Sequence, residues 1–188
     1  MIFIPIFVVL YCQLIPDKST QIQYEISTGY AIIPIMEHTL IFETPMPCSV
    51  KTLFDFHADT KNLPRITPKN TSVEILKLET PLKEGNEAIL RIKKGLLSFV
   101  WELRFEEVRY PDLIVDVATR SPFKSFRHEH HFIVVDGTHS LLRDKIIFSL
   151  PFWPLSMPAV YFVKRDMKKM FAFRHAQTKA FIASSSVT

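Results

Sequence analysis

Two adjacent stretches between Ser121 and Pro151 alternate apolar and polar residues in the way that paired β-strands require. Successive side chains of a strand point to opposite faces, so residues of one parity share a face. One face of the first stretch carries Phe126, His128, His130, Phe132 and Val134, and one face of the second carries Leu142, Asp144, Ile146, Phe148 and Leu150. Single imidazole and carboxylate groups are costly in a dry apolar core. The pattern therefore predicts that these strands form the wall of a cavity.

Further strand-like segments precede this pair. A first strand is expected at Glu37–Glu43, and Pro45 and Pro47 are expected to end it. The remaining strands are expected at Ser72–Glu79, Asn86–Lys93, Leu97–Tyr110, Leu113–Arg120, Lys124–Val135 and Ser140–Leu150. Turn-forming pairs such as Asp136-Gly137 separate them, which indicates a run of antiparallel strands.

Three helical segments complete the pattern. Ser49 can cap a helix that places Leu53 and His57 on one side, and a short helical turn is expected at Asp59–Leu63, stopped by Pro64. A long helix is expected from Pro158 to Ile182, with apolar residues at helical spacing. Its remaining surface is expected to carry Lys164, Arg165, Lys168, Lys169 and Arg174. The order of elements predicts an α+β fold in which a curved antiparallel sheet grips the C-terminal helix and leaves a pocket between them.

Composition fits one compact domain and excludes several classes of protein. The chain has 188 residues, of which 47% are hydrophobic, enough for one sizeable core. A net charge of +4 without a recognisable binding motif argues against nucleic acid as a partner. The two cysteines, Cys12 and Cys48, make no disulfide framework and favour a reduced, cytoplasmic setting.

The N-terminal 35 residues are predicted to lie outside the domain. Residues 1–15 are almost wholly apolar but too few for a spanning helix, which needs about 20 residues. Met36 stands directly before the first strand, so it is a second candidate start site. The alternative is a short membrane anchor or export signal in residues 1–15. The domain is accordingly expected at 36–183, followed by a tail at 184–188.

Four passages together resemble the SRPBCC superfamily of START/Bet v 1-like helix-grip proteins, in its bacterial ligand-binding and polyketide cyclase-like branch. They are CSVKTLFDFHAD at Cys48–Asp59, NLPRITP at Asn62–Pro68, PFKSFRHEHHF at Pro122–Phe132 and LLRDKIIFSLP at Leu141–Pro151. The resemblance covers nearly the whole domain from Met36 to about Ala183, and it is more specific for fold than for activity.

This resemblance implies a cavity for a small hydrophobic ligand such as a lipid, isoprenoid, polyketide or aromatic compound. Binding without chemistry and without a cofactor is the preferred interpretation. One alternative is a cofactor-free cyclase or dehydratase. A second is a lipid carrier whose basic terminal helix contacts the membrane surface peripherally. The sequence does not fix the oligomeric state.

Aromatic and methionine side chains on the expected sheet and helix are the candidate ligand contacts. Together with two histidines they are Phe99, Trp101, Leu103, Phe123, Phe126, His128, His130, Phe132, Met167, Met170 and Phe171, and Phe162 is a further candidate for the helix wall. Met suits a pliant apolar site because its side chain is flexible.

His130 and Asp144 are the candidate acid–base pair, with Asp116 as a spare carboxylate. Against this, Asp144 could pair with Arg127 or Arg143 within the sheet. The turn at residues 136–139 leaves open whether His130 and Asp144 share a face, because a shift of one residue reverses every side chain.

The segment at His128–His131 also raises the question of a metal site, because an HxH pair on a strand points two imidazoles the same way. Zinc needs a third protein ligand, and from sequence Asp144 is the only nearby candidate. A buried, hydrogen-bonded histidine pair is the preferred interpretation, so no metal is expected.

Overall fold

The computed structural model describes residues 36–152 and 154–185. Residues 1–35, which include Cys12 and the candidate anchor at 1–15, lie outside the described residues, and so do residues 186–188 of the expected tail. Within the described ranges, no helix combines the length and apolar character that crossing a membrane requires.

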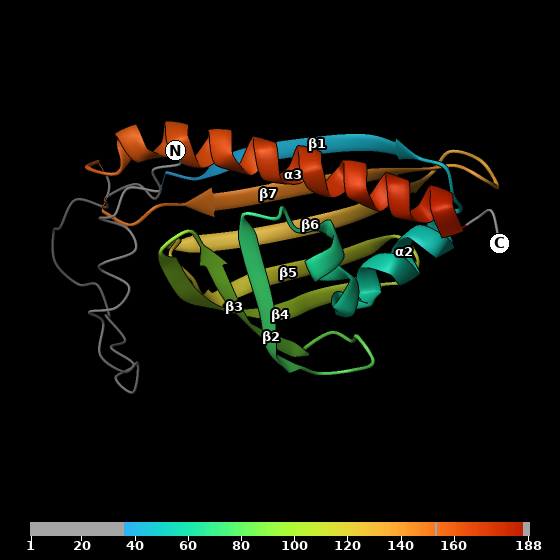
Figure 1. Cartoon of the computed structure of the whole chain (residues 1–188), viewed down its shortest axis with the longest axis horizontal. Coiled ribbons are helices and arrows are strands. Elements are labelled where there is room, and N and C mark those ends of the chain that lie inside the picture. The colour runs from blue at the N-terminus through green and yellow to red at the C-terminus, as the bar shows by residue number, and fades with distance from the viewer. Residues whose placement is uncertain (1–35, 153, 186–188) are drawn as a thin grey trace, which may run out of the picture.

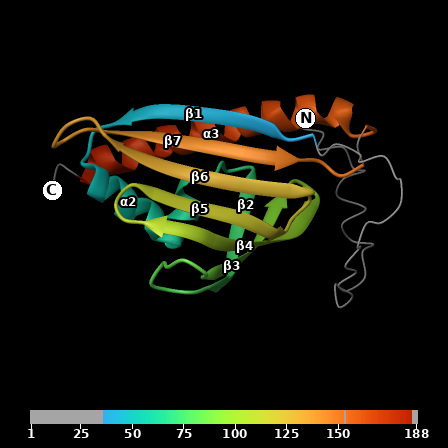
Figure 2. The ribbon, with the colours of Figure 1, turned by 180° about the vertical axis from the view of Figure 1, so that it is seen from behind.

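Seven antiparallel strands form one curved sheet in the order β1-β7-β6-β5-β4-β3-β2, as Figures 1 and 2 show from two sides. The strands are β1 (His38–Met46), β2 (Thr71–Leu78), β3 (Glu87–Lys94), β4 (Leu97–Arg109), β5 (Leu113–Arg120), β6 (Ser125–Val134) and β7 (Ser140–Ser149). All seven predicted strands are present, with ends that differ by a few residues. β1 continues through Pro45, contrary to expectation, because it lies at the sheet edge, where a residue without an N–H is tolerated.

In the described part of the chain, two short helices and one long helix accompany the sheet. α2 (Val50–Ala58) begins at the predicted cap, where the Ser49 hydroxyl accepts a hydrogen bond from the Thr52 N–H at 3.3 Å. The 3₁₀ helix η1 (Thr60–Ile66) contains Pro64 instead of stopping there, since the Pro64 carbonyl still accepts the closing bond from the Thr67 N–H. The long helix α3 (Met157–Ser185) runs across the sheet, and the whole is the predicted helix-grip fold (Figure 1).

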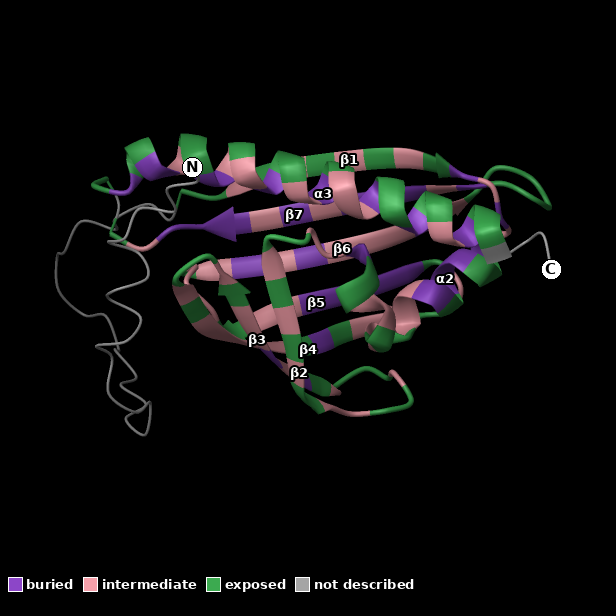
Figure 3. Cartoon of the chain, in the orientation of Figure 1, coloured by how far each residue is buried: buried purple, intermediate pink, exposed green. Residues whose placement is uncertain are grey.

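One face of α3 is buried against the sheet along most of its length (Figure 3). Its buried residues recur mainly every fourth position, which keeps them in one stripe. They are Ala159, Val163, Met167, Phe171, His175, Thr178 and Ile182. Aliphatic and aromatic side chains of the sheet pack against this stripe, so α3 and the sheet share one core.

The pairing of β5, β6 and β7 places four polar residues on the face toward α3. His130 lies directly opposite Asp144, and Asp116 directly opposite His128. Five residues, 135–139, connect β6 to β7, and this odd number aligns even positions of one strand with even positions of the next. The register that the sequence left open therefore brings His130 and Asp144 together.

Candidate functional site

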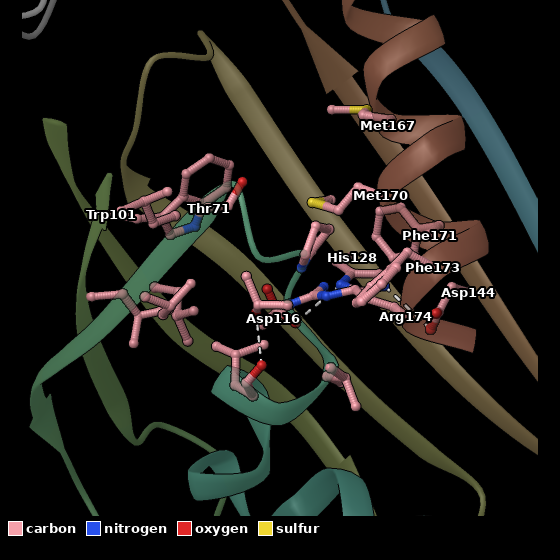
Figure 4. A pocket seen from close by; sticks show the side chains of 18 of the residues that line it. Thr71, Trp101, Asp116, His128, Asp144, Met167, Met170, Phe171, Phe173 and Arg174 are labelled. Atoms are coloured by element: carbon pink, nitrogen blue, oxygen red, sulfur yellow. Dashed lines mark hydrogen bonds and ion pairs between the residues drawn. The ribbon is translucent and has the colours of Figure 1, made fainter. Parts of the chain in front are cut away.

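A cavity of about 430 Å³ lies between the sheet, α3 and η1. Its volume falls in the range that is usual for small-molecule sites. Among the predicted ligand contacts, those in its wall are Phe99, Trp101, Leu103, Phe123, Phe126, His128, His130, Met167, Met170 and Phe171. Figure 4 shows Trp101 on the sheet side of this space and Met167, Met170 and Phe171 on the helix side.

Two predicted wall residues lie elsewhere. Phe132 is buried beside the cavity, where its ring packs edge-on against Phe54 with a centroid distance of 5.4 Å. Phe162 projects to the surface of α3 and is 46% exposed. The helix wall is instead built from residues on the buried stripe and its flanks, because only that side of α3 faces the sheet.

The apolar part of the cavity is lined by aromatic rings in edge-to-face contact. Trp101 stands nearly perpendicular to Phe126 at a centroid distance of 4.9 Å, and it meets Phe123 edge-on at 5.7 Å. Such contacts hold the rings in defined orientations. This end of the cavity is therefore a preformed apolar surface.

The polar part centres on Asp144, which is 3% exposed and surrounded by three imidazoles. One carboxylate oxygen lies 2.7 Å from His130 Nδ1 and 3.3 Å from His128 Nε2, although neither contact has hydrogen-bond alignment. The other oxygen accepts a hydrogen bond of 2.7 Å from His175 Nε2. The Nδ1 atom of His175 is in turn 2.8 Å from the Thr44 hydroxyl. Strands β1, β6 and β7 and helix α3 all contribute to this cluster.

The alternative partners proposed for Asp144 are engaged elsewhere. Arg127 pairs with Glu106 and Glu129, and Arg143 pairs with Glu43 on the opposite face of the sheet. Pairing of Asp144 with either arginine was therefore the wrong alternative, since residues of odd number on β6 and β7 point away from α3.

Burial and charge act in opposite directions on the cluster. Burial lowers the pKa of His130, but Asp144 and Asp116 outweigh burial and raise that pKa to about 9. Burial raises the pKa of Asp144, yet His130 and His128 hold it well below its usual value. Burial and the adjacent His130 both lower the pKa of His128. With a pKa of about 9, His130 is an imidazolium at neutral pH.

Two further polar side chains face the cavity. The His57 Nδ1 lies 2.8 Å from the Leu53 carbonyl oxygen, and burial together with His130 lowers the His57 pKa to about 3. Arg174 lies over the Phe171 ring, 5.5 Å from its centroid, and burial lowers the pKa of its guanidinium. The Arg174 Nε is buried without a hydrogen-bond partner in the part of the chain that is described. Arg174 is thus turned toward the cavity and does not belong to the outer surface predicted for it.

His57, Arg174 and His175 were not predicted as site residues. His57 follows Leu53 by four positions, and His175 follows Phe171 by four. This spacing places each histidine on the apolar side of its helix, which is a signal that sequence reasoning could have used. Arg174 follows Met170 by the same interval.

One group of side chains has the composition of a metal site. Asp116, His128 and His130 each direct one ligand atom toward the others, and these three atoms lie within 4.8 Å of one another. The third ligand of this group is Asp116 rather than the Asp144 considered from sequence. Asp144 stands on the far side of the two imidazole rings.

The fold and the cavity define a helix-grip protein with an internal cavity. A family model described as "Polyketide cyclase / dehydrase and lipid transport" matches residues 46–174. The chain belongs to this family, which confirms the SRPBCC assignment, and membership supports a ligand-binding or cyclase role. A search of curated proteins found no match.

Solved structures with the same fold come from bacteria and plants. The Zhui aromatase/cyclase from a Streptomyces species has a TM-score of 0.64 at 12% identity, covering 79% of this chain and 94% of its own. Norcoclaurine synthase from Thalictrum flavum, in complex with dopamine and hydroxybenzaldehyde, has a TM-score of 0.60 at 12% identity, with coverages of 86% and 97%. Ara h 8.0201 has a TM-score of 0.56 at 13% identity, with coverages of 76% and 98%. At these identities the likeness establishes the fold alone.

Proposed function

We propose that the protein binds one small hydrophobic molecule in the cavity between the sheet and α3. The observation that carries this proposal is the composition of the wall, with aromatic and methionine side chains at one part and a buried polar cluster at another. A site of this kind buries an apolar body and fixes its orientation through a few polar contacts.

The polar contacts further suggest the kind of ligand. Arg174 offers donors to the cavity and accepts nothing, because a guanidinium has no lone pair to share. Arg174 lines the cavity, and a buried guanidinium gains free energy when a ligand oxygen accepts one of its hydrogen bonds. The proposed ligand is therefore an apolar molecule with an oxygen-bearing end, such as a ketone, a phenol or a carboxylate.

A cofactor-free cyclase or dehydratase is the second candidate. The observation in its favour is that His130 stands on the cavity wall with Asp144 2.7 Å away and Asp116 3.5 Å away. An imidazolium held in this way can act as a general acid, and such groups contribute about 10²–10⁴ in rate. Binding is preferred because the same contacts also serve a purely structural role.

Native mass spectrometry of gently purified protein tests the binding proposal. We expect one apolar molecule per chain on the wild type. The matched variants lie on α3: Met170→Trp fills part of the cavity, whereas Tyr161→Trp introduces the same side chain on the exposed side. The bound molecule should be lost from Met170→Trp and retained by Tyr161→Trp. A ligand present in equal amount on both variants would place binding outside the cavity.

The identified ligand then separates binding from catalysis. If His130 performs proton chemistry, His130→Ala should abolish conversion of the ligand while affinity stays within a few-fold. If the protein only binds, the ligand should be recovered unchanged after long incubation with the wild type.

A further inference from the structure

Three potential ligand atoms converge on one point of the cavity wall. The Asp116 Oδ2 atom on β5 lies 3.6 Å from His128 Nδ1 and 3.5 Å from His130 Nε2, both on β6. Asp116 and His128 are 8% and 4% exposed, so both side chains are largely removed from bulk solvent. Figure 4 shows Asp116 and His128 turned toward each other from neighbouring strands.

The spacing of these atoms suits a metal ion better than direct hydrogen bonds. N–H···O hydrogen bonds measure about 2.7–3.2 Å, so contacts of 3.5 and 3.6 Å are long for them. Two ligands bound tetrahedrally to one ion, each at about 2.1 Å, stand about 3.4 Å apart. Two of the three distances therefore match the spacing of ligands on a common ion, and the two imidazole nitrogens lie within 4.8 Å of each other.

Asp144 stands where the outer carboxylate of metal-binding histidines would stand, although its contacts with the two rings lack hydrogen-bond alignment. It lies 2.7 Å from His130 Nδ1 and 3.3 Å from His128 Nε2, the ring nitrogens that face away from Asp116. Histidines that bind metals usually donate this second N–H to a carboxylate, which fixes the tautomer and raises the basicity of the other nitrogen. Asp144 is itself held by a hydrogen bond from His175 Nε2, so the carboxylate behind the two rings is fixed in place.

A positive charge is favoured at the point where the ligand atoms of Asp116, His128 and His130 converge. When both histidines direct their N–H groups at Asp144, the lone pairs of His128 Nδ1 and His130 Nε2 face the Asp116 carboxyl group. Lone pairs and a carboxylate repel one another in a buried place unless a cation stands between them. A proton can fill this place, and so can a metal ion.

We propose that Asp116, His128 and His130 bind one divalent first-row transition-metal ion. Two imidazoles and one carboxylate are the ligands of catalytic zinc sites and of non-haem iron(II) sites, both of which keep open coordination positions. The three residues lie on the cavity wall, so the open positions face the space that the ligand would occupy. The ion would replace the proton between His130 and Asp116, so metal binding and proton chemistry by His130 are alternatives. The proposal does not depend on which small molecule the cavity holds.

Metal titration of the full chain, purified without an affinity tag and stripped with EDTA, tests the proposal. We expect one Zn²⁺ per chain by calorimetry. Co²⁺ should give the visible absorption bands of a four- or five-coordinate ion with nitrogen ligands. Asp116→Asn preserves the shape of the side chain but removes its charge, and it should abolish both signals. Asp144→Asn should weaken Zn²⁺ affinity about 10- to 100-fold, as outer-contact substitutions do.

His131→Gln is the matched control. His131 follows His130 directly but faces the other side of the sheet, where its Nε2 lies 3.0 Å from Glu129. This variant should bind Zn²⁺ and Co²⁺ as the wild type does, and circular dichroism should show that all variants are folded. The proposal is overturned if the wild type binds no stoichiometric ion. It is equally overturned if folded Asp116→Asn keeps the ion and its Co²⁺ spectrum.

Discussion

Replacing Asp144 by Asn should destabilise the protein more than any surface charge substitution. Asn keeps the size of the side chain but removes the negative charge that three imidazoles share, and its amide places donors against ring N–H groups. Removing one partner of a buried charged pair costs about 3–5 kcal/mol. A domain of this size has about 5–15 kcal/mol of total stability. The melting temperature should therefore fall by about 6–20 °C.

Urea unfolding followed by circular dichroism, with EDTA present so that no bound ion contributes, measures this loss. Glu43→Gln is the control, because Glu43 forms an ion pair with Arg143 on the adjacent strand while its side chain is 45% exposed. Exposed pairs of this kind contribute about 0–1 kcal/mol. If Asp144→Asn lowers the free energy of unfolding no more than Glu43→Gln does, the contacts of Asp144 with the three histidines do not stabilise the fold.

Three other predictions concern stability. The pKa of His57 is lowered to about 3 in the folded state, so below the unfolded value of 6.5 the unfolded chain binds more protons than the folded chain. The free energy of unfolding should therefore fall as the pH drops from 6.5 to 3, by up to about 1.4 kcal/mol per pH unit. Urea titrations should show a shallower fall in His57→Gln. Phe171→Ala, which empties a fully buried position, should cost about 3–5 kcal/mol by chemical denaturation, whereas Phe162→Ala at an exposed position of α3 should cost under about 1 kcal/mol. A chain that begins at Met36 should melt cooperatively near the temperature of the full chain in calorimetry, and loss of folding would mean that residues 1–35 supply core.

The strands and the long helix were predictable because their hydrophobic periodicity is strong. The register between β6 and β7 was not, since it depends on how many residues of the loop at 135–139 leave the sheet. The number of loop residues decides whether the side chains of His130 and Asp144 lie on the same face of the sheet or on opposite faces. The sequence therefore singled out His130 and Asp144 as candidates without establishing their contact.

The remaining site residues depend on tertiary structure. Asp116 joins the cluster only because β5 pairs with β6 in a register that sets it opposite His128. Arg174 lies on the flank of the buried stripe of α3, where sequence alone does not distinguish a cavity-facing cation from a solvated one. The direction of α3 across the sheet decides whether Arg174 faces the cavity or the solvent. This direction follows from tertiary packing rather than from local sequence.

Titration with a fluorescent naphthalene-type probe tests the central claim, that the cavity binds a small apolar molecule. The account predicts saturable binding of one probe per chain, with quenching of the Trp101 fluorescence, because Trp101 lies in the cavity wall. Trp101→Phe should remove this quenching while binding persists, and Met170→Trp should abolish binding. Absence of saturable binding, or binding that Met170→Trp leaves unchanged, would contradict the account.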